Sequence, residues 1–407
     1  MTDDQGYWDT GVTGHPHLNT PNIDQLAADG AQLMQYYAAP VCAPTRAGIM
    51  TGRHYLRTGV YNTRFGGDTL GESETTIASI LSDAGYRTGL FGKWHLGQHP
   101  GFRPTERGFD EFFGHYHGHI ERYQHPDQIY HNEEPVKARG YVTDLFTDAA
   151  IDFIDNARQD SSQPFLCMLM YNAPHSPFVM DTSHADLSQG DKTIEHYLDR
   201  GMPFREARIA AMIERIDRNL GRLFNQLAEW SLENETVVVL TSDNGGVSKF
   251  FKAGLRGQKA SVFEGGVRAP CFVRWPGKIP AGRKVNGLAW HVDWFSTFCE
   301  IAGADLPQDR PTDGRSILSA LTGDQTDIDR EFVCHTWDRY VPNPDRRWAI
   351  HSGKWKLLCN GGTSQNPTRK DWLLFDLDKD PSEKTNLASQ HEGIVKDLRV
   401  KFTSWFK

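Results

Sequence analysis

The chain has 407 residues, of which 38% are hydrophobic and 24% charged, and its formal net charge is −8. That length is enough for a full hydrophobic core and for about two domains. The acidic balance argues against nucleic acid as a bulk partner, because a phosphate backbone demands a basic surface, and no apolar run is long enough to span a bilayer.

Short apolar runs alternate with helical periods through most of the chain, which predicts a layered α/β sheet. We expect helices over residues 20–30, capped by Thr20 and closed by Gly30, and over residues 74–85, closed by Gly85. A longer helix is predicted over residues 205–230 from apolar residues at helical spacing, which are Ile209, Ile213, Ile216, Leu220, Leu223, Leu227 and Trp230.

Two apolar runs, over residues 164–174 and 236–246, are too short for helices and predict buried strands with polar ends. The six cysteines form no CxxC pair, so zinc-knuckle and redox motifs are not supported. Cys167 and Cys271 lie in apolar runs, and we expect both to be small buried hydrophobic side chains.

The pattern changes beyond Thr322. Short strands are predicted within residues 330–337, 346–359 and 372–380, the middle pair joined by a turn at Ser352-Gly353, and a closing helix over residues 391–406. We therefore expect a large domain over residues 1–325 and a small α+β domain over residues 326–407.

Oxygen donors follow one predicted strand and also occur at the start of the chain. Asp243 and Asn244 end the run at 236–246, where open α/β sheets bind ligands, and oxygen donors there suit Ca²⁺ or Mg²⁺. Asp3 and Asp4 are two adjacent carboxylates, which repel each other unless a cation or proton neutralises them. The alternatives are an ordinary turn at Asp243 and a frayed acidic terminus.

Cationic and imidazole groups lie in further glycine- and proline-rich segments. Cys42 is followed by Arg46 at what resembles the start of a helix, and GKWHLG places Lys93 and His95 two residues apart, which on a strand would put both on one face. His175 and Lys259 lie in two later loops. Together with a carboxylate-bound cation, these cationic and imidazole groups suit the binding of a compact, highly charged anion.

With these residues assembled, the chain resembles a type I sulfatase, a branch of the alkaline phosphatase superfamily. The resemblance covers nearly the whole chain and rests on six motifs in the family's order: DDQGYWD, CAPTRAGIMTGR, GKWHLG, APHSP, TSDNGG and GQKASVFEGGVRAP. It implies an alkaline phosphatase-like fold, with a large central mixed β-sheet flanked by helices and a small C-terminal domain of antiparallel sheet plus helix.

The resemblance also implies the cofactors. Cys42 would be oxidised after synthesis to formylglycine, whose hydrate is the nucleophile, by a formylglycine-generating or anaerobic sulfatase-maturating enzyme that reads the cysteine and its neighbours. One Ca²⁺ per chain would be bound by Asp3, Asp4, Asp243, Asn244 and an oxygen of modified residue 42.

Roles for the remaining residues follow from the same resemblance. Arg46 would hold the hydrate and the metal-site carboxylates, and His95 would exchange protons with the hydrate. Lys93, His175 and Lys259 would contact the sulfate, while Asp243 would take a proton as attack begins. The expected reaction is hydrolysis of a sulfated carbohydrate or an aryl sulfate, with release of inorganic sulfate.

Three alternatives remain open at this point. Relatives with the same aldehyde hydrolyse phosphonate monoesters or phosphodiesters, and an inactive relative would bind sulfated glycans only. A thiol hydrolase using unmodified Cys42 is disfavoured, because the surroundings suit anions rather than a Cys–His pair. The family usually has an apolar strand before the Asp-Asp pair. We expect such a strand to precede Met1, together with any secretion signal, which would place the protein in the periplasm or outside the cell.

Alternate histidines also call for an interpretation: His115, His117, His119 and His125. They are typical of zinc-binding tracts, but no cysteine or carboxylate spacing completes a zinc site, so we favour a substrate-facing rim. Trp337, Tyr340 and Trp348 could extend that rim from the small domain or form its core, and the core is favoured for Trp348, which lies in a strand-like run.

Overall fold

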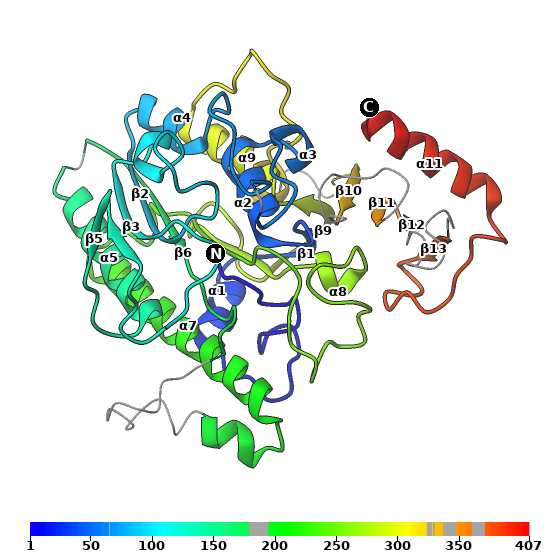
Figure 1. Cartoon of the computed structure of the whole chain (residues 1–407), viewed down its shortest axis with the longest axis horizontal. Helices are drawn as coiled ribbons and strands as arrows, with labels where there is room; N and C mark the ends of the chain where they lie inside the picture. Colours follow the sequence, from blue (N-terminus) through cyan, green and yellow to red (C-terminus); the bar gives the residue numbers. More distant parts are fainter. Residues whose placement is uncertain are drawn as a thin grey trace.

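The computed structural model describes residues 1–64, 66–160, 162–178, 194–323, 328, 330–336, 347–359 and 371–406. Trp337 and Tyr340, for which a rim and a core position are both open, lie outside the described residues. Figure 1 shows a large body of sheets and helices, with the C-terminal sheet and its helix to one side.

Two mixed sheets make up the body. The first has the order β5–β4–β3–β2–β6, in which β2 is parallel to both β3 and β6, while β3, β4 and β5 pair antiparallel. Its strands are β2 (Arg87–Lys93), β3 (Glu111–His115), β4 (Ile129–His131), β5 (Glu134–Val136) and β6 (Phe165–Met170).

The second sheet has the order β7–β8–β1–β9, with β1 parallel to β9 and the other pairs antiparallel. Its strands are β1 (Ala31–Tyr37), β7 (Val238–Thr241), β8 (Cys271–Arg274) and β9 (Arg283–Trp290). The two predicted buried strands are therefore confirmed as β6 and β7.

The first three residues connect the two sheets. The amide of Tyr171, just after β6, donates to Met1 O at 2.9 Å, and Asp3 N donates to Ala173 O at 3.1 Å. On the other side, Thr2 N donates to Thr241 O at 2.8 Å, and Thr2 forms a parallel bridge with Ser242. Beyond Met1, an apolar cavity of about 480 Å³ lies between β6 and β7. The expectation of an apolar strand before Asp3 stays a prediction.

Helices cover both faces of the body. They are α1 (Pro21–Ala28), α2 (Cys42–Thr51), α3 (Tyr55–Thr58), α4 (Ile77–Asp83), a 3₁₀ turn η1 (Pro104–Arg107), α5 (Val142–Ala157), α7 (Phe204–Glu229), α8 (Glu264–Val267), α9 (Asp293–Ala302) and α10 (Leu318–Thr322). Helices α5 and α7 pack against each other on one face, while α2, α4 and α9 pack together on the other.

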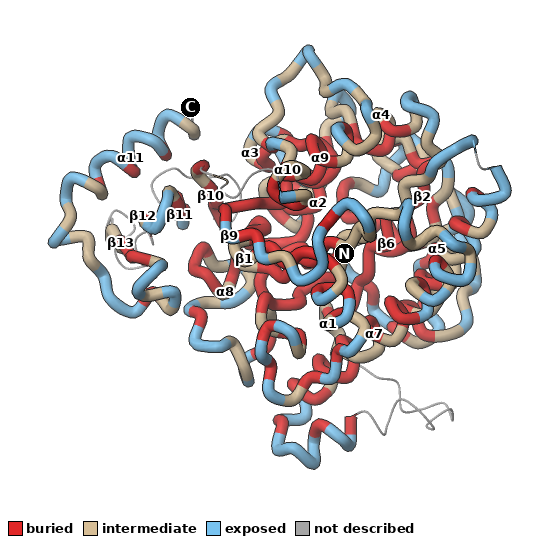
Figure 2. Tube along the Cα trace, turned by 180° about the vertical axis from the view of Figure 1, so that it is seen from behind, coloured by how far each residue is buried: buried red, intermediate tan, exposed pale blue. Residues whose placement is uncertain are grey.

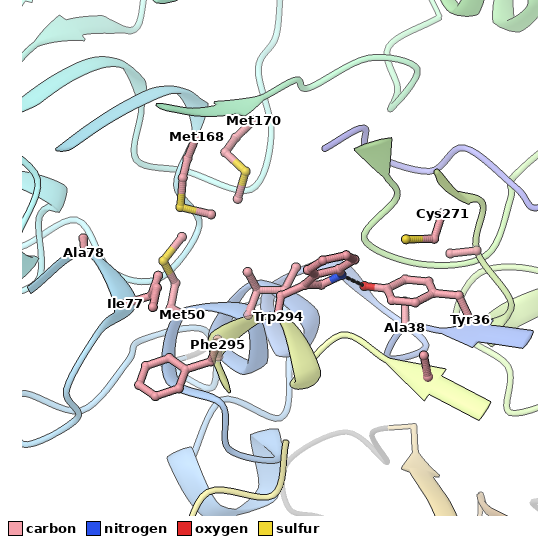
Figure 3. Packing of buried hydrophobic residues seen from close by; sticks show 14 of the residues in the cluster. Tyr36, Ala38, Met50, Ile77, Ala78, Met168, Met170, Cys271, Trp294 and Phe295 are labelled. Carbon is pink, nitrogen blue, oxygen red and sulfur yellow. Dashed lines mark hydrogen bonds between the residues drawn. The ribbon is translucent and has the colours of Figure 1, made fainter. Parts of the chain in front are cut away.

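Alternating residues of strand β6 pack into the hydrophobic cores on opposite faces of its sheet, because successive side chains of a strand point to opposite sides. In β6, Leu169 belongs to the α5–α7 core, whereas Met168 and Met170 belong to the α2–α4–α9 core. Figure 3 shows the second core, where the indole Nε1 of Trp294 donates to the hydroxyl of Tyr36 at 3.1 Å. Figure 2 shows the buried residues concentrated along the strands and the inner helix faces.

The predicted helices are confirmed with small shifts at their ends. Thr20 is the N-cap of α1, but its hydroxyl accepts from Gly11 N and donates to Asp24, so it makes no side-chain cap. Thr76 does cap α4, through a capping box with Ser79. The apolar stripe of α7 is buried, except that Trp230, at its end, is only half-buried.

A separate antiparallel sheet follows, in the order β10–β11–β12–β13. Its strands are β10 (Glu331–His335), β11 (Trp348–Ser352), β12 (Trp355–Cys359) and β13 (Trp372–Asp376), and α11 (Glu392–Phe406) covers it. Trp348 is buried and stacks on Phe402 at 3.7 Å between ring centroids, which confirms the core interpretation. No helix in the described part of the chain is both long and apolar enough to cross a membrane.

Candidate active site

The ends of three chain segments converge in the middle of the body. Strand β2 ends at Lys93, β7 is followed by Asp243 and Asn244, and the segment that joins the two sheets ends at Asp3 and Asp4. All five residues are buried. Because these segments are parallel, their polar ends meet at one edge, where open α/β sheets bind ligands.

Cys42 is the first residue of α2, as the sequence suggested, and is buried. Its Sγ lies 3.3 Å from Nδ1 of His95. Burial raises the pKa of the Cys42 thiol in spite of nearby Lys93 and Lys259. Burial, together with Lys93 and Arg46, holds the pKa of His95 well below its ordinary value. A neutral thiol beside a neutral imidazole is not the thiolate–imidazolium pair of a thiol hydrolase.

His95 does not share a strand face with Lys93, which corrects one expectation. Strand β2 ends at Lys93, and His95 follows with a φ of +62°. This left-handed turn directs the imidazole to Cys42. Its other nitrogen lies 3.2 Å from Thr63 O, and Gly118 packs so closely on the ring that a Cβ there would lie 2.2 Å from it.

Arg46 lies one turn along α2 and is completely buried. Its Nε and Nη2 both donate to Oδ2 of Asp243, at 3.1 and 2.9 Å, and its Nη1 donates to Lys93 O at 2.6 Å. Burial and the neighbouring Asp3 raise the pKa of Asp243, and Arg46 opposes that rise. The guanidinium thus fixes one carboxylate and the end of β2 together.

Each lysine pairs with one carboxylate of the Asp-Asp pair. Lys93 Nζ lies 2.5 Å from Asp3 Oδ2, and Lys259 Nζ lies 2.5 Å from Asp4 Oδ1. Burial raises the pKa of Asp4, but Lys259 and His175 outweigh that effect and leave it below its ordinary value. Burial lowers the pKa of Lys259, but Asp4 and Cys42 outweigh that effect and raise it.

One side of the cluster is open to solvent. The side chains of Lys259 and His175 are 19% and 14% exposed, whereas those of Lys93 and Arg46 are fully buried. His175 Nε2 lies 3.9 Å from Asp4 Oδ2. An anion can therefore approach past His175 and Lys259, with the buried groups beneath it.

Two buried oxygens in the cluster have no hydrogen-bond partner among the residues that the structure describes: Oδ1 of Asp3 and Oδ1 of Asn244. The amide nitrogen of Asn244 donates to Asp4 Oδ1 at 2.9 Å, which orients the amide oxygen away from that carboxylate. Ligand atoms of Asp3, Cys42 and Asp243 all lie within 4.8 Å of one another, and so do those of Asp3, Asp4 and His175. Unsatisfied buried oxygens are costly unless a cation fills the gap, so the residues fit a hard cation.

Every residue predicted for the site thus lies in one cluster, and Asp68, which no sequence signal marks, lies beside it. Oδ2 of Asp68 lies 3.7 Å from Nε2 of His95. An isolated aspartate in a loop carries no motif, and only the fold places it there.

The four alternate histidines do not act together. His115 is buried against Phe146, His119 lies 5.8 Å from His175 between ring centroids, and the ring of His125 accepts from Gly140 N. Among the described residues, the groups that could hold a metal contain none of these histidines. His119 therefore lies beside the site, whereas His115 lies opposite Lys93 in the β2–β3 pairing but is buried, which corrects the rim interpretation for that residue. For His117 and His125 the rim interpretation stays a prediction.

Comparisons with known proteins agree with this geometry. Residues 1–304 match the family model described as Sulfatase, and residues 257–405 match the model described as N-sulphoglucosamine sulphohydrolase, C-terminal. N-acetylgalactosamine-6-sulfatase from Sus scrofa is 33% identical over 98% of this chain and 83% of that protein. The same enzyme from Homo sapiens is 32% identical over 95% of this chain and 80% of that protein.

Solved structures show the same fold. The crystal structure of Ps i-CgsB in complex with k-i-k-neocarrahexaose has a TM-score of 0.88 and is 28% identical, covering 100% of this chain and 91% of that one. The phosphonate monoester hydrolase of Agrobacterium radiobacter shares the fold at a TM-score of 0.69 and 18% identity, covering 100% of this chain and 95% of that one. The chain therefore belongs to the sulfatase family, with an alkaline phosphatase-like fold, and is a sulfuric ester hydrolase.

Proposed function

We propose that this sulfatase releases inorganic sulfate from a sulfated carbohydrate, with Cys42 as the precursor of its nucleophile and one Ca²⁺ held beside it. The observation that carries the proposal is that ligand atoms of Asp3, Cys42 and Asp243 lie within 4.8 Å of one another, while Oδ1 of Asp3 and Oδ1 of Asn244 are buried without a hydrogen-bond partner among the described residues. The similarity to N-acetylgalactosamine-6-sulfatases and to a sulfatase-fold structure solved with a neocarrahexaose supports a carbohydrate substrate.

Asp3, Asp4, Asp243 and Asn244 are the residues that would hold the calcium ion. Three carboxylates and one amide oxygen match the oxygen donors that Ca²⁺ prefers. When bound, the ion would offset negative charge on the transferring group and lower the pKa of an oxygen ligand. Its charge would also compensate the repulsion between Asp3 and Asp243, which raises the pKa of Asp243 in the protein alone.

Residue 42 would supply the nucleophile after conversion to formylglycine by a maturation enzyme. The hydrated aldehyde carries two hydroxyls, so one can attack sulfur while the other remains to release the product. His95, 3.3 Å from Sγ of Cys42 and neutral, is placed to exchange protons with that residue. Arg46 holds Asp243 in position and adds positive charge beneath the site.

Lys93, Lys259 and His175 would bind the sulfate. Attack on a sulfate ester brings negative charge to an anionic group, so preorganised cations lower the barrier, by about 3 kcal/mol for each well-placed donor. Lys93 lies at the buried end of the cluster, and Lys259 and His175 lie at its open side. The two groups at the open side are the ones placed to protonate the departing alcohol.

The test is a rate comparison on matched substrates, together with a mass measurement. Purified protein with Ca²⁺ should release sulfate from N-acetylgalactosamine 6-sulfate or from a carrageenan oligosaccharide. Its rate of sulfate release from an aryl sulfate should exceed its rate of phosphate release from the matched aryl phosphate monoester or diester. The peptide containing residue 42 should show the mass of an aldehyde in place of a thiol.

Each contrary outcome identifies a different error. Preferred hydrolysis of the phosphodiester or of a phosphonate monoester would replace the proposed substrate class. Glycan binding without sulfate release, by protein with confirmed aldehyde and added Ca²⁺, would identify an inactive binder. Sulfate release by protein whose residue 42 is an intact thiol would overturn the proposed nucleophile.

A further inference from the structure

A second buried ion cluster lies between the body and the C-terminal sheet. Lys356, on β12, has its Nζ 2.7 Å from Glu264 Oε1 and 3.0 Å from Glu383 Oε1. All three side chains are at most 1% exposed. Tyr37 OH donates to Glu264 Oε2 at 3.0 Å, and Arg268 Nη1 lies 3.7 Å from the same oxygen. The sulfatase chemistry described above uses none of these groups.

This cluster holds both ends of the segment that carries Lys259. At its C-terminal end, the backbone N–H of Glu264 donates to Glu383 Oε2 at 2.8 Å. Near its N-terminal end, Arg256 Nη1 donates to Glu383 O at 2.9 Å, and Arg256 O accepts from Gly265 N at 2.7 Å. Residues 256–265 thus form a closed loop that is fastened to Glu383 at two points.

Within that loop, Lys259 is held by backbone bonds to the active site. Lys259 N donates to Gly246 O at 3.2 Å, and Ala260 N donates to Pro40 O at 2.7 Å, two residues before Cys42. The C-terminal sheet adds a third contact, since Thr336 Oγ1 donates to Ala260 O at 3.2 Å. The position of one active-site cation therefore depends on residues that come much later in the chain.

The backbone conformation of Glu383 supports the view that this residue holds the Lys259 loop. Its φ is +53°, in the left-handed region that costs a residue with a Cβ about 1 kcal/mol or more. The strained turn brings its carboxylate and its carbonyl to opposite ends of one loop. Figure 1 shows α8, which begins at Glu264, lying between the body and the C-terminal sheet.

We propose that Lys356 and Glu383 are positioning residues for sulfate hydrolysis, which act by fixing Glu264 and thereby the Lys259 loop. Through Lys356, the C-terminal sheet then helps to position an active-site cation and is not only a stabilising neighbour. This inference rests on the proposed role of Lys259 in sulfate binding.

Lys356→Met is the principal variant, because it keeps an unbranched side chain only one atom shorter and removes the charge. We expect kcat/KM for an aryl sulfate to fall by about 10²-fold, the cost of misplacing a reacting group by about 1 Å. Lys354→Met is the matched control, since Lys354 lies on the same hairpin, its side chain is 43% exposed and its Nζ lies 3.1 Å from Asp376 Oδ2, away from Glu264 and Glu383. Its kcat/KM should stay within twofold of the parent.

A double-mutant cycle separates positioning from general stability. Lys356→Met should cost activity in the parent but almost nothing in the Lys259→Met background, because the residue it positions is already gone. If the two losses multiply instead, Lys356 does not act through Lys259 and the inference is wrong. If Lys259→Met alone has no effect, the proposed role of Lys259 fails, which is a separate result.

A second variant keeps the test valid if Lys356→Met does not fold. Glu383→Gln keeps an acceptor for Glu264 N but faces Lys356 with an uncharged group, so the loop should loosen with less structural damage. We expect about a tenfold loss of kcat/KM that again disappears in the Lys259→Met background. Full activity of Glu383→Gln would overturn the role given to Glu383.

Discussion

Lys93 Nζ lies 2.5 Å from Asp3 Oδ2 with both side chains fully buried, so a strand end and the start of the chain share one ion pair. Removing one partner of a buried pair leaves an uncompensated charge, which costs about 3 kcal/mol or more. Asp3→Asn should therefore lower the free energy of unfolding by about that amount without added Ca²⁺, measured by urea denaturation.

The same variant should also lose activity, because Asp3 is one of the proposed calcium ligands. The control is Asp305→Asn, at an exposed position outside the cluster, which should change stability by less than about 0.5 kcal/mol. Wild-type stability of Asp3→Asn would contradict the importance of the buried pair.

Cys42→Ser should bind substrate but stall after at most one turnover. A serine hydroxyl can attack sulfur, but the resulting ester lacks the second hydroxyl that would expel sulfate. Rapid-quench measurement of sulfate transfer, compared with steady-state release, checks this. Cys167→Ser, at a half-buried cysteine away from the site, should retain turnover. Sustained turnover by Cys42→Ser near the parent rate would refute the proposed nucleophile.

Calcium removal should lower both activity and stability. A ligand that binds only the folded state at 100 times its Kd adds about 2.7 kcal/mol, so chelation should lower Tm by several degrees and Ca²⁺ should restore it. Asn244→Ala removes an oxygen that has no hydrogen-bond partner in the described part of the chain, and we expect calcium affinity to weaken about tenfold or more.

Asn234→Ala, at an exposed asparagine, serves as the control for the calcium titration and should leave affinity unchanged. Equal calcium affinity in Asn244→Ala and the parent would remove Asn244 from the ligand set.

Asp9 gives a prediction for pH. Burial raises its pKa to about 7, aided by Glu206 and opposed by the Gly6 N–H, whereas an unfolded aspartate ionises near pH 4. Between those values the folded state keeps a proton that the unfolded state has lost, so stability falls as pH rises from about 4 to 7.

Asp9→Asn removes that proton linkage and should flatten the decline in Tm over this pH range. Denaturation of both proteins at several pH values checks it, with Asp305→Asn again as the exposed control. A decline in Asp9→Asn as steep as in the parent would show that other groups cause it.

The sequence determined much of the fold, because hydrophobic period and chain-local signals need no tertiary partner. The long stripe from Ile209 to Leu227 predicted α7, and the apolar runs predicted β6 and β7. The helix predicted over residues 74–85 is present as α4, and Ser352-Gly353 joins β11 to β12. The boundary between domains near residue 325 lies outside the described residues and stays a prediction.

The chemical types at the site were also evident from sequence, since Asp3, Cys42, Lys93, Asp243 and Lys259 lie in ordered motifs. Their pairing was not. The packing of separate segments decides which lysine pairs with which carboxylate. It also decides the left-handed turn that brings His95 to Cys42, and the approach of Asp68 to His95.

Tertiary structure alone decided the link from Lys356 and Glu383 to the Lys259 loop. Hydrogen bonds between residues about 120 positions apart leave no periodic trace in a sequence, because each partner is locally an ordinary charged residue. Charge pairing in a buried space is set by distance and solvent exclusion, and only the packed fold specifies both.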